Sequence, residues 1–151
     1  MRGEDAGLPR HEAFAVLAAA PEEALVQLWR DSGLPDDGML LRGPETGLVA
    51  LRGRVGGGGS PFNFGEATVT RASVKLPSGE IGHAYALGRG REKARISATI
   101  DALRQKPEMV AEVDRKILEP LARNLREQDE RRRAEIAATR VEFFTMTRGE
   151  D

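Results

Sequence analysis

The chain has 151 residues, the size of one domain, and its composition of 40% apolar and 31% charged residues is typical of a globular protein. A net charge of −1 gives no bulk field that would attract nucleic acid or an anionic membrane. All but four of the 23 basic residues are arginine, which suits bidentate phosphate and carboxylate contacts, although genomic base composition explains this bias more simply.

Cysteine is absent, which excludes disulfides and an iron–sulfur cluster held by thiolates of this chain. With only His11 and His83, a zinc site built from this chain alone is not expected, so we predict no metal site. The stretch from Ala13 to Pro21 resembles the apolar part of a signal peptide, but the acidic residues before it are wrong for one. No apolar run approaches the length of a membrane span, so we expect no membrane contact and a cytoplasmic protein.

The N-terminal third is predicted to be helical. Residues 10–20 are rich in alanine, and Pro21 suits the first position of a second short helix. Leu25, Leu28 and Trp29 have the spacing of one helix face, and this helix is expected to stop near Gly33.

The middle of the chain is predicted to form antiparallel hairpins. Pro44-Glu45-Thr46-Gly47 separates two apolar runs and indicates a first turn, and Pro77-Ser78-Gly79 indicates a second. An even-length second connection would pair Leu76 with Ile81 and Val74 with His83, which matches apolar positions with apolar positions. On that register His83 lies on the apolar face, where a core histidine with one hydrogen bond is the expected state.

The strand from Phe62 to Leu76 has an anomaly at its even positions, which are apolar at both ends and polar in the middle. Either Glu66, Thr68 and Thr70 line a polar pocket, or a bulge changes the side-chain phase. Fifteen residues exceed the usual strand length, so a bend near Gly65 is expected in both cases.

The last third is predicted to be helical again. Apolar residues at helical spacing run through residues 96–103 and 110–125, and a kink of the second helix is expected at Pro120. Residues 126–133 contain no apolar side chain, so they form either a solvated helix segment or a linker. The expected class is therefore α+β, with residues 1–151 forming one domain: a small sheet of hairpins flanked by N-terminal helices and a long C-terminal helical segment.

An apolar tail at residues 141–147 follows the polar stretch. Its apolar side chains either fold back onto the core or dock on another subunit, as exposed apolar clusters often do. The candidate docking residues are Val141, Phe143, Phe144 and Met146.

The glycine run at residues 56–59 does not match known phosphate loops. No Lys-Ser/Thr pair ends it, the third glycine of a dinucleotide-binding pattern is missing, and no helix follows it. A flap beside Arg52 and Arg54 remains open, with an ordinary exposed hairpin loop as the stronger alternative. Glu66 is the best general-base candidate by position, and its alternative is a carboxylate satisfied by Arg71 or by backbone amides. No complete catalytic constellation is found.

The central region resembles a known family. It combines the arginine-flanked glycine run, the pattern F-N-x-G-E-A-T-V-T-R, the pattern G-x-x-G-H-A-Y-x-L-G-R and a following A-x-x-x-A-x-x-D-A-L helix. In these features, and in the closing T-R-V-E-F-F-T-M, the chain is similar to the G subunit of the bacterial carbon–phosphorus lyase system, the PhnG family. Only the first few residues and the stretch at 126–133 are not covered by this likeness.

The resemblance implies a role in organic phosphonate catabolism as one subunit of a core complex with H-, I- and J-type subunits. That complex converts ATP and methylphosphonate into α-D-ribose 1-methylphosphonate 5-triphosphate and releases adenine. The chain is not expected to be active alone, and it is expected to carry no cofactor: ATP is a substrate of the complex, and the iron–sulfur cluster and S-adenosylmethionine belong to another subunit.

Two other functions stay open. One is an anion-binding interaction module with a glycine-rich flap and no catalytic role. The other, an arginine-rich RNA-binding domain, is weaker, because few aromatic residues and no RNA-binding motif accompany the arginines. The candidate anion or partner contacts are Arg52, Arg54, Gly56, Gly57, Gly58, Gly59, Asn63, Glu66, Arg71, His83 and Arg89.

Overall fold

A computed structural model of the chain describes residues 7–54 and 58–146, with side chains up to residue 138. It confirms the predicted α+β class. The elements are α1 (Arg10–Ala19), α2 (Glu22–Ser32), β1 (Met39–Arg54), β2 (Pro61–Lys75), β3 (Ile81–Leu87), α3 (Arg91–Leu103), α4 (Pro107–Val113), the π-helical turn η2 (Asp114–Leu118) and α5 (Glu119–Met146). Among these residues, none of the helices carries an apolar stretch that would reach across a bilayer.

Helices cover one face of a three-stranded antiparallel sheet of order β1-β2-β3. Thr70, Ala72 and Val74 of β2 are buried on the face that packs against α3. Gly82 of β3 lies directly against the backbone of α3, so a Cβ at this position would collide with it. Behind α3 the apolar sides of the helices form the core, whose fully buried side chains include Leu25, Ile96, Ile100, Leu103, Ile117 and Leu121.

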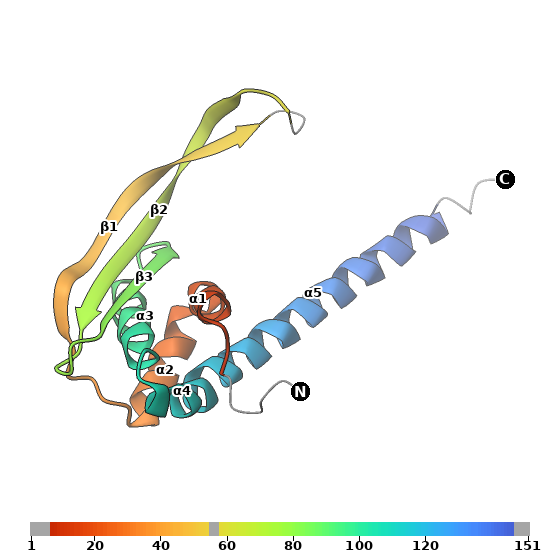
Figure 1. Ribbon diagram of the computed structural model, residues 1–151. Helices are drawn as coiled ribbons and strands as arrows, with labels where there is room; N and C mark the ends of the chain where they lie inside the picture. The colour runs from red at the N-terminus through yellow and green to blue at the C-terminus, as the bar shows by residue number, and fades with distance from the viewer. Residues whose placement is uncertain (1–6, 55–57, 147–151) are drawn as a thin grey trace.

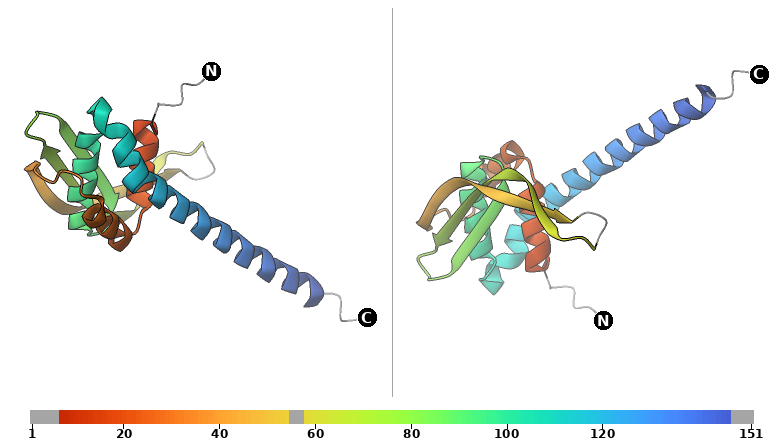
Figure 2. Two further views of the ribbon diagram at one scale, coloured as in Figure 1. Left: turned by 90° about the horizontal axis from the view of Figure 1, so that it is seen from below. Right: turned by 90° about the horizontal axis from the view of Figure 1, so that it is seen from above.

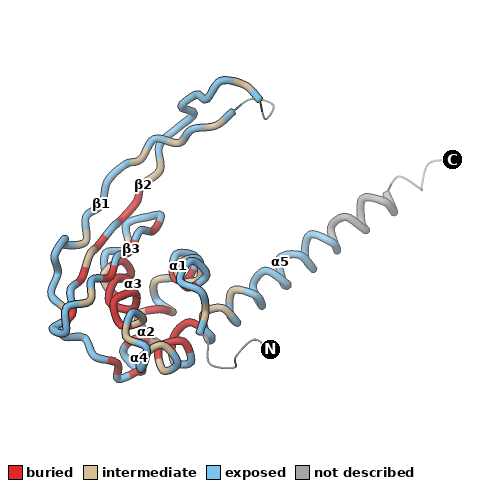
Figure 3. Tube along the Cα trace, in the orientation of Figure 1, coloured by how far each residue is buried: buried red, intermediate tan, exposed pale blue. Residues whose placement is uncertain are grey.

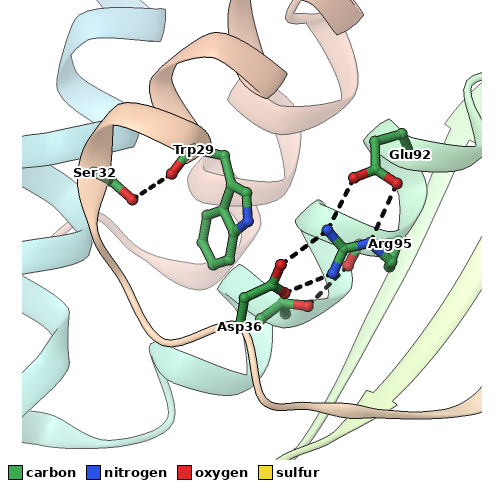
Figure 4. A network of polar contacts seen from close by, with 6 residues as sticks. Trp29, Ser32, Asp36, Glu92 and Arg95 are labelled. Carbon is green, nitrogen blue, oxygen red and sulfur yellow. Dashed lines mark hydrogen bonds and ion pairs between the residues drawn. The ribbon is translucent and has the colours of Figure 1, made fainter.

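The segment between α2 and β1 is tied to α3 by a polar network (Figure 4). The guanidinium of Arg95 donates to both carboxylate oxygens of Asp36, at 2.6 and 3.1 Å, and also to Glu92. At the end of α2, the Ser32 hydroxyl donates to the carbonyl oxygen of Trp29 at 2.7 Å, and Gly33 closes the helix at a φ of 63°. These contacts fix where β1 begins.

Two elements project from this body. The ends of β1 and β2, residues 48–54 and 61–68, continue as a two-stranded ribbon beyond the end of β3, and we call this ribbon the arm. The long helix α5 leaves the body on the same side, and the two diverge (Figures 1 and 2). Buried residues are concentrated in the body, whereas the arm and the outer part of α5 are mostly exposed (Figure 3).

The first predicted hairpin turn is wrong. Residues 44–47 lie inside the single strand β1, which shows register shifts against β2 between Leu40 and Arg42 and between Arg42 and Glu45. Pro44 is tolerated there because β1 is an edge strand, where bulges and a missing N–H donor cost little.

The predicted register of the second hairpin is wrong by one residue. Val74 pairs with Gly82 and Ser73 with His83, so the tight connection is the odd-length Pro77-Ser78-Gly79, closed by a hydrogen bond from Leu76 to Glu80 at 2.9 Å. Gly79 has a φ of 111°, a conformation that suits three-residue loops with a glycine. The one-residue shift moves His83 from the apolar face to the exposed face.

The bulge that was one of the two alternatives for the long strand is present. Leu51 pairs with Gly65 whereas Arg52 pairs with Asn63, so Phe64 is an extra residue beside Gly65. The pocket alternative does not hold, because Glu66 is exposed. Thr70 is instead buried and bonded to the Thr46 hydroxyl at 3.0 Å and to the Gly88 carbonyl oxygen at 2.7 Å.

The last helical region is interrupted at η2, just before Pro120, and not at the proline itself. A π-helical turn accommodates a position at which the regular backbone hydrogen bonding is broken. Residues 126–133 lie within α5, whose backbone runs straight on to Met146 and away from the body (Figure 1).

Candidate functional site

An open groove of about 620 Å³ lies over the exposed face of the sheet. One wall is α1, which lies beside β3, and the floor is formed by β3 and β2. The opposite side is bordered by the bulged part of β1. Its lining residues are His11, Phe14, Ala15, Ala18, Arg42, Arg71, Ala72, Ser73, His83, Ala84 and Tyr85. The volume lies within the range of ligand sites in proteins, but the shape is that of an open surface.

His83, which lines this groove, is held by two contacts. Its Nδ1 atom lies 2.9 Å from the Ser73 hydroxyl, and its backbone N–H donates to the Asp101 carboxylate at 2.9 Å. A hydroxyl next to an imidazole is a possible nucleophile–base pair. However, Asp101 contacts the backbone and not the ring of His83, and in the part of the chain that the structure describes no carboxylate orients the imidazole. The pair therefore fits a binding role better than a catalytic one.

Asp101 is buried and links α1, α3 and β3. It accepts a bidentate pair of hydrogen bonds from Arg10, at 2.9 and 2.8 Å, in addition to the His83 N–H. This hydrogen bonding raises the pKa of Arg10 above its ordinary value. The Arg10 guanidinium also lies over the Phe14 ring, 5.2 Å from its centre. These contacts hold the start of α1 against the sheet and so shape the groove.

The β1 side of the groove carries positive charge. Arg71 pairs with Glu45 at 3.1 Å, and Arg42 approaches the same carboxylate at 4.0 Å. Glu45 therefore takes the place that was considered for Glu66 as the partner of Arg71. One carboxylate is shared by two guanidinium groups that are each about half exposed, so the groove keeps capacity to bind an anionic group.

The structure divides the predicted contact residues into separate places. Arg71 and His83 share the groove. Four others lie on the arm, where all are exposed: Arg52, Arg54, Asn63 and Glu66. Arg89 is exposed in the loop before α3, and Gly58 and Gly59 lie at the end of the arm.

The remaining predicted residues fall outside what is described. Gly56 and Gly57 lie outside the described residues, and so do the side chains of Val141, Phe143, Phe144 and Met146. Whether any of the candidate residues contacts a ligand or a partner stays a prediction.

Sequence reasoning missed several residues of the groove. Arg42 was read as part of a hairpin, so its place opposite Ser73 was not visible. Ser73 and Tyr85 lie on the same face of the sheet as His83. The correct pairing of β2 with β3 would have been enough to predict this. His11 comes from α1, more than 60 positions before β3, and no local pattern links the two segments.

The described residues contain no group of three or more histidine, cysteine, aspartate or glutamate side chains arranged to hold a metal ion. Lys93 is the buried cation nearest to α1, and it donates to the carbonyl oxygens of Ala18 and Ala20, both at 2.6 Å. Burial lowers the pKa of Lys93 below its ordinary value, and Glu22 opposes this shift. Because both of its contacts cap the end of α1, Lys93 supports the groove wall without reaching the groove.

The fold and the groove define an α+β protein with an open, partly basic surface site flanked by two projecting elements. The family model described as "Phosphonate metabolism protein PhnG" matches residues 8–149, and the chain belongs to this family. The chain is also 47% identical over 149 residues to a protein of Rhizobium meliloti (strain 1021) described as "Alpha-D-ribose 1-methylphosphonate 5-triphosphate synthase subunit PhnG". This match covers 98% of the chain and 95% of the relative. The family predicted from the central motifs is confirmed.

Proposed function

We propose that this chain is a subunit of the carbon–phosphorus lyase core complex and works in the cytoplasm together with H-, I- and J-type subunits. The complex makes α-D-ribose 1-methylphosphonate 5-triphosphate from ATP and methylphosphonate and releases adenine. The observation that carries this proposal is the end-to-end match to a relative described as a subunit of that synthase.

The shape of the molecule favours the role of a partner subunit over that of an independent enzyme. The groove on the exposed face of the sheet is open, and its histidine–serine pair lacks an orienting carboxylate within the described residues. Its arm and α5 project where another protein can contact both. The iron–sulfur cluster and S-adenosylmethionine that serve the later cleavage of the carbon–phosphorus bond are assigned in this proposal to the J-type subunit.

The test is an assay of adenine release from ATP and methylphosphonate. The chain alone is expected to release none, the purified H-, I- and J-type subunits little, and the reconstituted set with this chain much more. Turnover by the isolated chain would sink the partner-subunit proposal. So would equal turnover by the other subunits with and without this chain.

An anion-binding module without a catalytic role is the second candidate. It is favoured by the two guanidinium groups, of Arg42 and Arg71, that share one carboxylate in the groove. Isothermal titration with inorganic triphosphate tests it directly. Binding that weakens about tenfold in Arg71→Ala supports this candidate, and the absence of measurable binding to the wild-type chain contradicts it.

A further inference from the structure

The outer edge of β1 contains an unprotected stretch. Residues 46–51 read Thr-Gly-Leu-Val-Ala-Leu, without a charge or a proline, and they pair with β2 in continuous register. Leu48 is 64% exposed, and Thr46 and Ala50 are exposed as well. A regular, uncharged, apolar edge of this kind readily pairs with another strand.

The direction of the backbone groups along this edge follows from a contact on the other side of β2. The Thr68 carbonyl oxygen accepts a hydrogen bond from the Gly88 N–H at 2.8 Å, so the peptide groups of Thr68 face β3. Thr68 pairs with Leu48, which makes this a pair without mutual hydrogen bonds. Leu48 therefore directs its own N–H and C=O outward, and by alternation Thr46 and Ala50 do the same.

Several other stretches of the sheet edges are protected. On β3 the outward N–H of His83 is bound by Asp101, and the Ile81 carbonyl oxygen accepts from Gln105 at 2.6 Å. Earlier in β1, register shifts and Pro44 disturb the edge. On the free side of β2 within the arm, the bulge at Phe64 and the charge of Glu66 have the same effect. Residues 46–51 carry none of these protections.

Two features of the arm indicate which kind of strand pairs with this edge of β1. A ribbon of two strands is marginally stable in water, so the arm gains most from a third strand. Arg52 and Arg54 follow the apolar stretch, are exposed, and make no ion pair within the described residues. An acidic residue on the added strand would complement them.

We infer that residues 46–51 of β1 accept an extended segment of a partner subunit as a fourth strand of the sheet. The segment is apolar in its middle and carries a carboxylate opposite Arg52 or Arg54. Main-chain hydrogen bonds to Thr46, Leu48 and Ala50 supply affinity, and the apolar and acidic side chains supply specificity. The inference rests on the proposed function only for the identity of the partner.

Hydrogen exchange tests this inference in the complex of the chain with the H-, I- and J-type subunits. The amides of Leu48 and Ala50 are expected to exchange at least about tenfold more slowly in the complex than in the isolated chain. A complex that forms while both amides exchange as before overturns the inference alone. If no complex forms, the proposed function fails and the inference falls with it.

A pair of proline variants is the matched control. Ala50 and Leu40 both lie on the open edge of β1, and each directs its N–H outward, because Leu40 pairs with Val74, whose peptide groups face β3 like those of Thr68. Ala50→Pro removes a donor within residues 46–51 and is expected to weaken the complex about tenfold, whereas Leu40→Pro removes a donor outside them and is expected to bind like the wild type. Equal binding by both variants overturns the inference. Self-association of the isolated chain that protects the same two amides assigns the edge to a second copy and also overturns it.

Discussion

The body of the molecule and its two projections bury their side chains to very different extents. In α3, ten of 13 residues are buried, including Lys93 and Asp101, which are held by hydrogen bonds to α1 and β3. In α5, every described side chain from Arg126 to Ala138 is exposed, and on the arm Phe62 and Phe64 are 46% and 59% exposed. A body of this kind folds on its own contacts, whereas exposed aromatic residues and a bare helix gain free energy only against another surface.

The comparison gives an ordered set of expectations. Substitutions in the body change the free energy of unfolding of the isolated chain. Substitutions on the projections leave it nearly unchanged and act on the complex instead. The predictions below run from the largest to the smallest expected change in this free energy.

Asp114→Ala is expected to lower the free energy of unfolding by about 3–5 kcal/mol, because it leaves a buried guanidinium without its partner. The Asp114 carboxylate accepts from Arg104 Nε at 2.6 Å and from the Leu8 N–H at 2.8 Å, and both charged side chains are more than 90% buried. Urea denaturation measures the change.

The matched control for Asp114 is Glu112→Ala. Glu112 pairs with Lys116 at 2.7 Å in the same helical region, but the pair is partly exposed. Because solvent screens this pair, its loss is expected to lower the free energy of unfolding far less than the loss of Asp114. Similar losses for the two variants would remove the distinction between buried and exposed charges in the body.

Lys93→Met is expected to lower the free energy of unfolding by about 1–3 kcal/mol at neutral pH, because two carbonyl oxygens at the end of α1, that of Ala20 among buried atoms, lose their donor. A second expectation concerns pH. Burial lowers the pKa of Lys93 in the folded chain below the ordinary value of 10.5. Between these two pKa values the unfolded chain binds the extra proton, so this lysine makes the wild type more stable as pH rises through that interval.

Urea denaturation at several alkaline pH values measures the pH effect. The free-energy difference between the wild type and Lys93→Met should grow with pH and level off above 10.5. Lys75→Met, at an exposed position of β2, should show no such growth. A constant difference for Lys93→Met would mean that Lys93 is not desolvated in the folded chain.

The same contrast between body and projections explains how much was visible in the sequence. The helices were predictable because apolar residues such as Leu25 and Trp29 recur at the spacing of a buried helix face. The bulge beside Gly65 was also foreseen as one alternative, because the polar middle of β2 breaks the alternation of a regular strand. Local sequence patterns thus predict those helices and strands that pack one face against the body.

The candidate site was harder to predict, since it depends on register and on contacts between distant segments. Gly79 was recognised as a turn residue, but its positive φ selects a three-residue loop, and this moved His83 to the exposed face. Arg42 reached the groove because two register shifts keep β1 in one strand through Pro44. Neither the loop length at Gly79 nor the register shifts around Pro44 produce a periodic pattern in the sequence, because each arises at a single place in the chain.

The double variant Phe62→Ser/Phe64→Ser tests the arm. The two ring centroids lie 6.1 Å apart near the end of the arm, next to Gly53, and both side chains are exposed. The free energy of unfolding of the isolated chain is expected to change by no more than about 0.5 kcal/mol. Co-purification with the partner subunits should fall clearly. A marked loss of stability in the isolated chain would show that the arm belongs energetically to the body.

Deletion of the residues after Arg140 is expected to have the smallest effect on the isolated chain. α5 extends away from the body long before this point, and Ile136 is already 60% exposed. The midpoint of urea denaturation should therefore be unchanged, because the described part of α5 leaves the body well before Arg140. In the complex, the deletion removes Val141, Phe143, Phe144 and Met146, and co-purification with the I-type subunit should weaken. If co-purification persists undiminished, the tail is not a docking element, and the partner contact of this chain then depends on the arm and the groove.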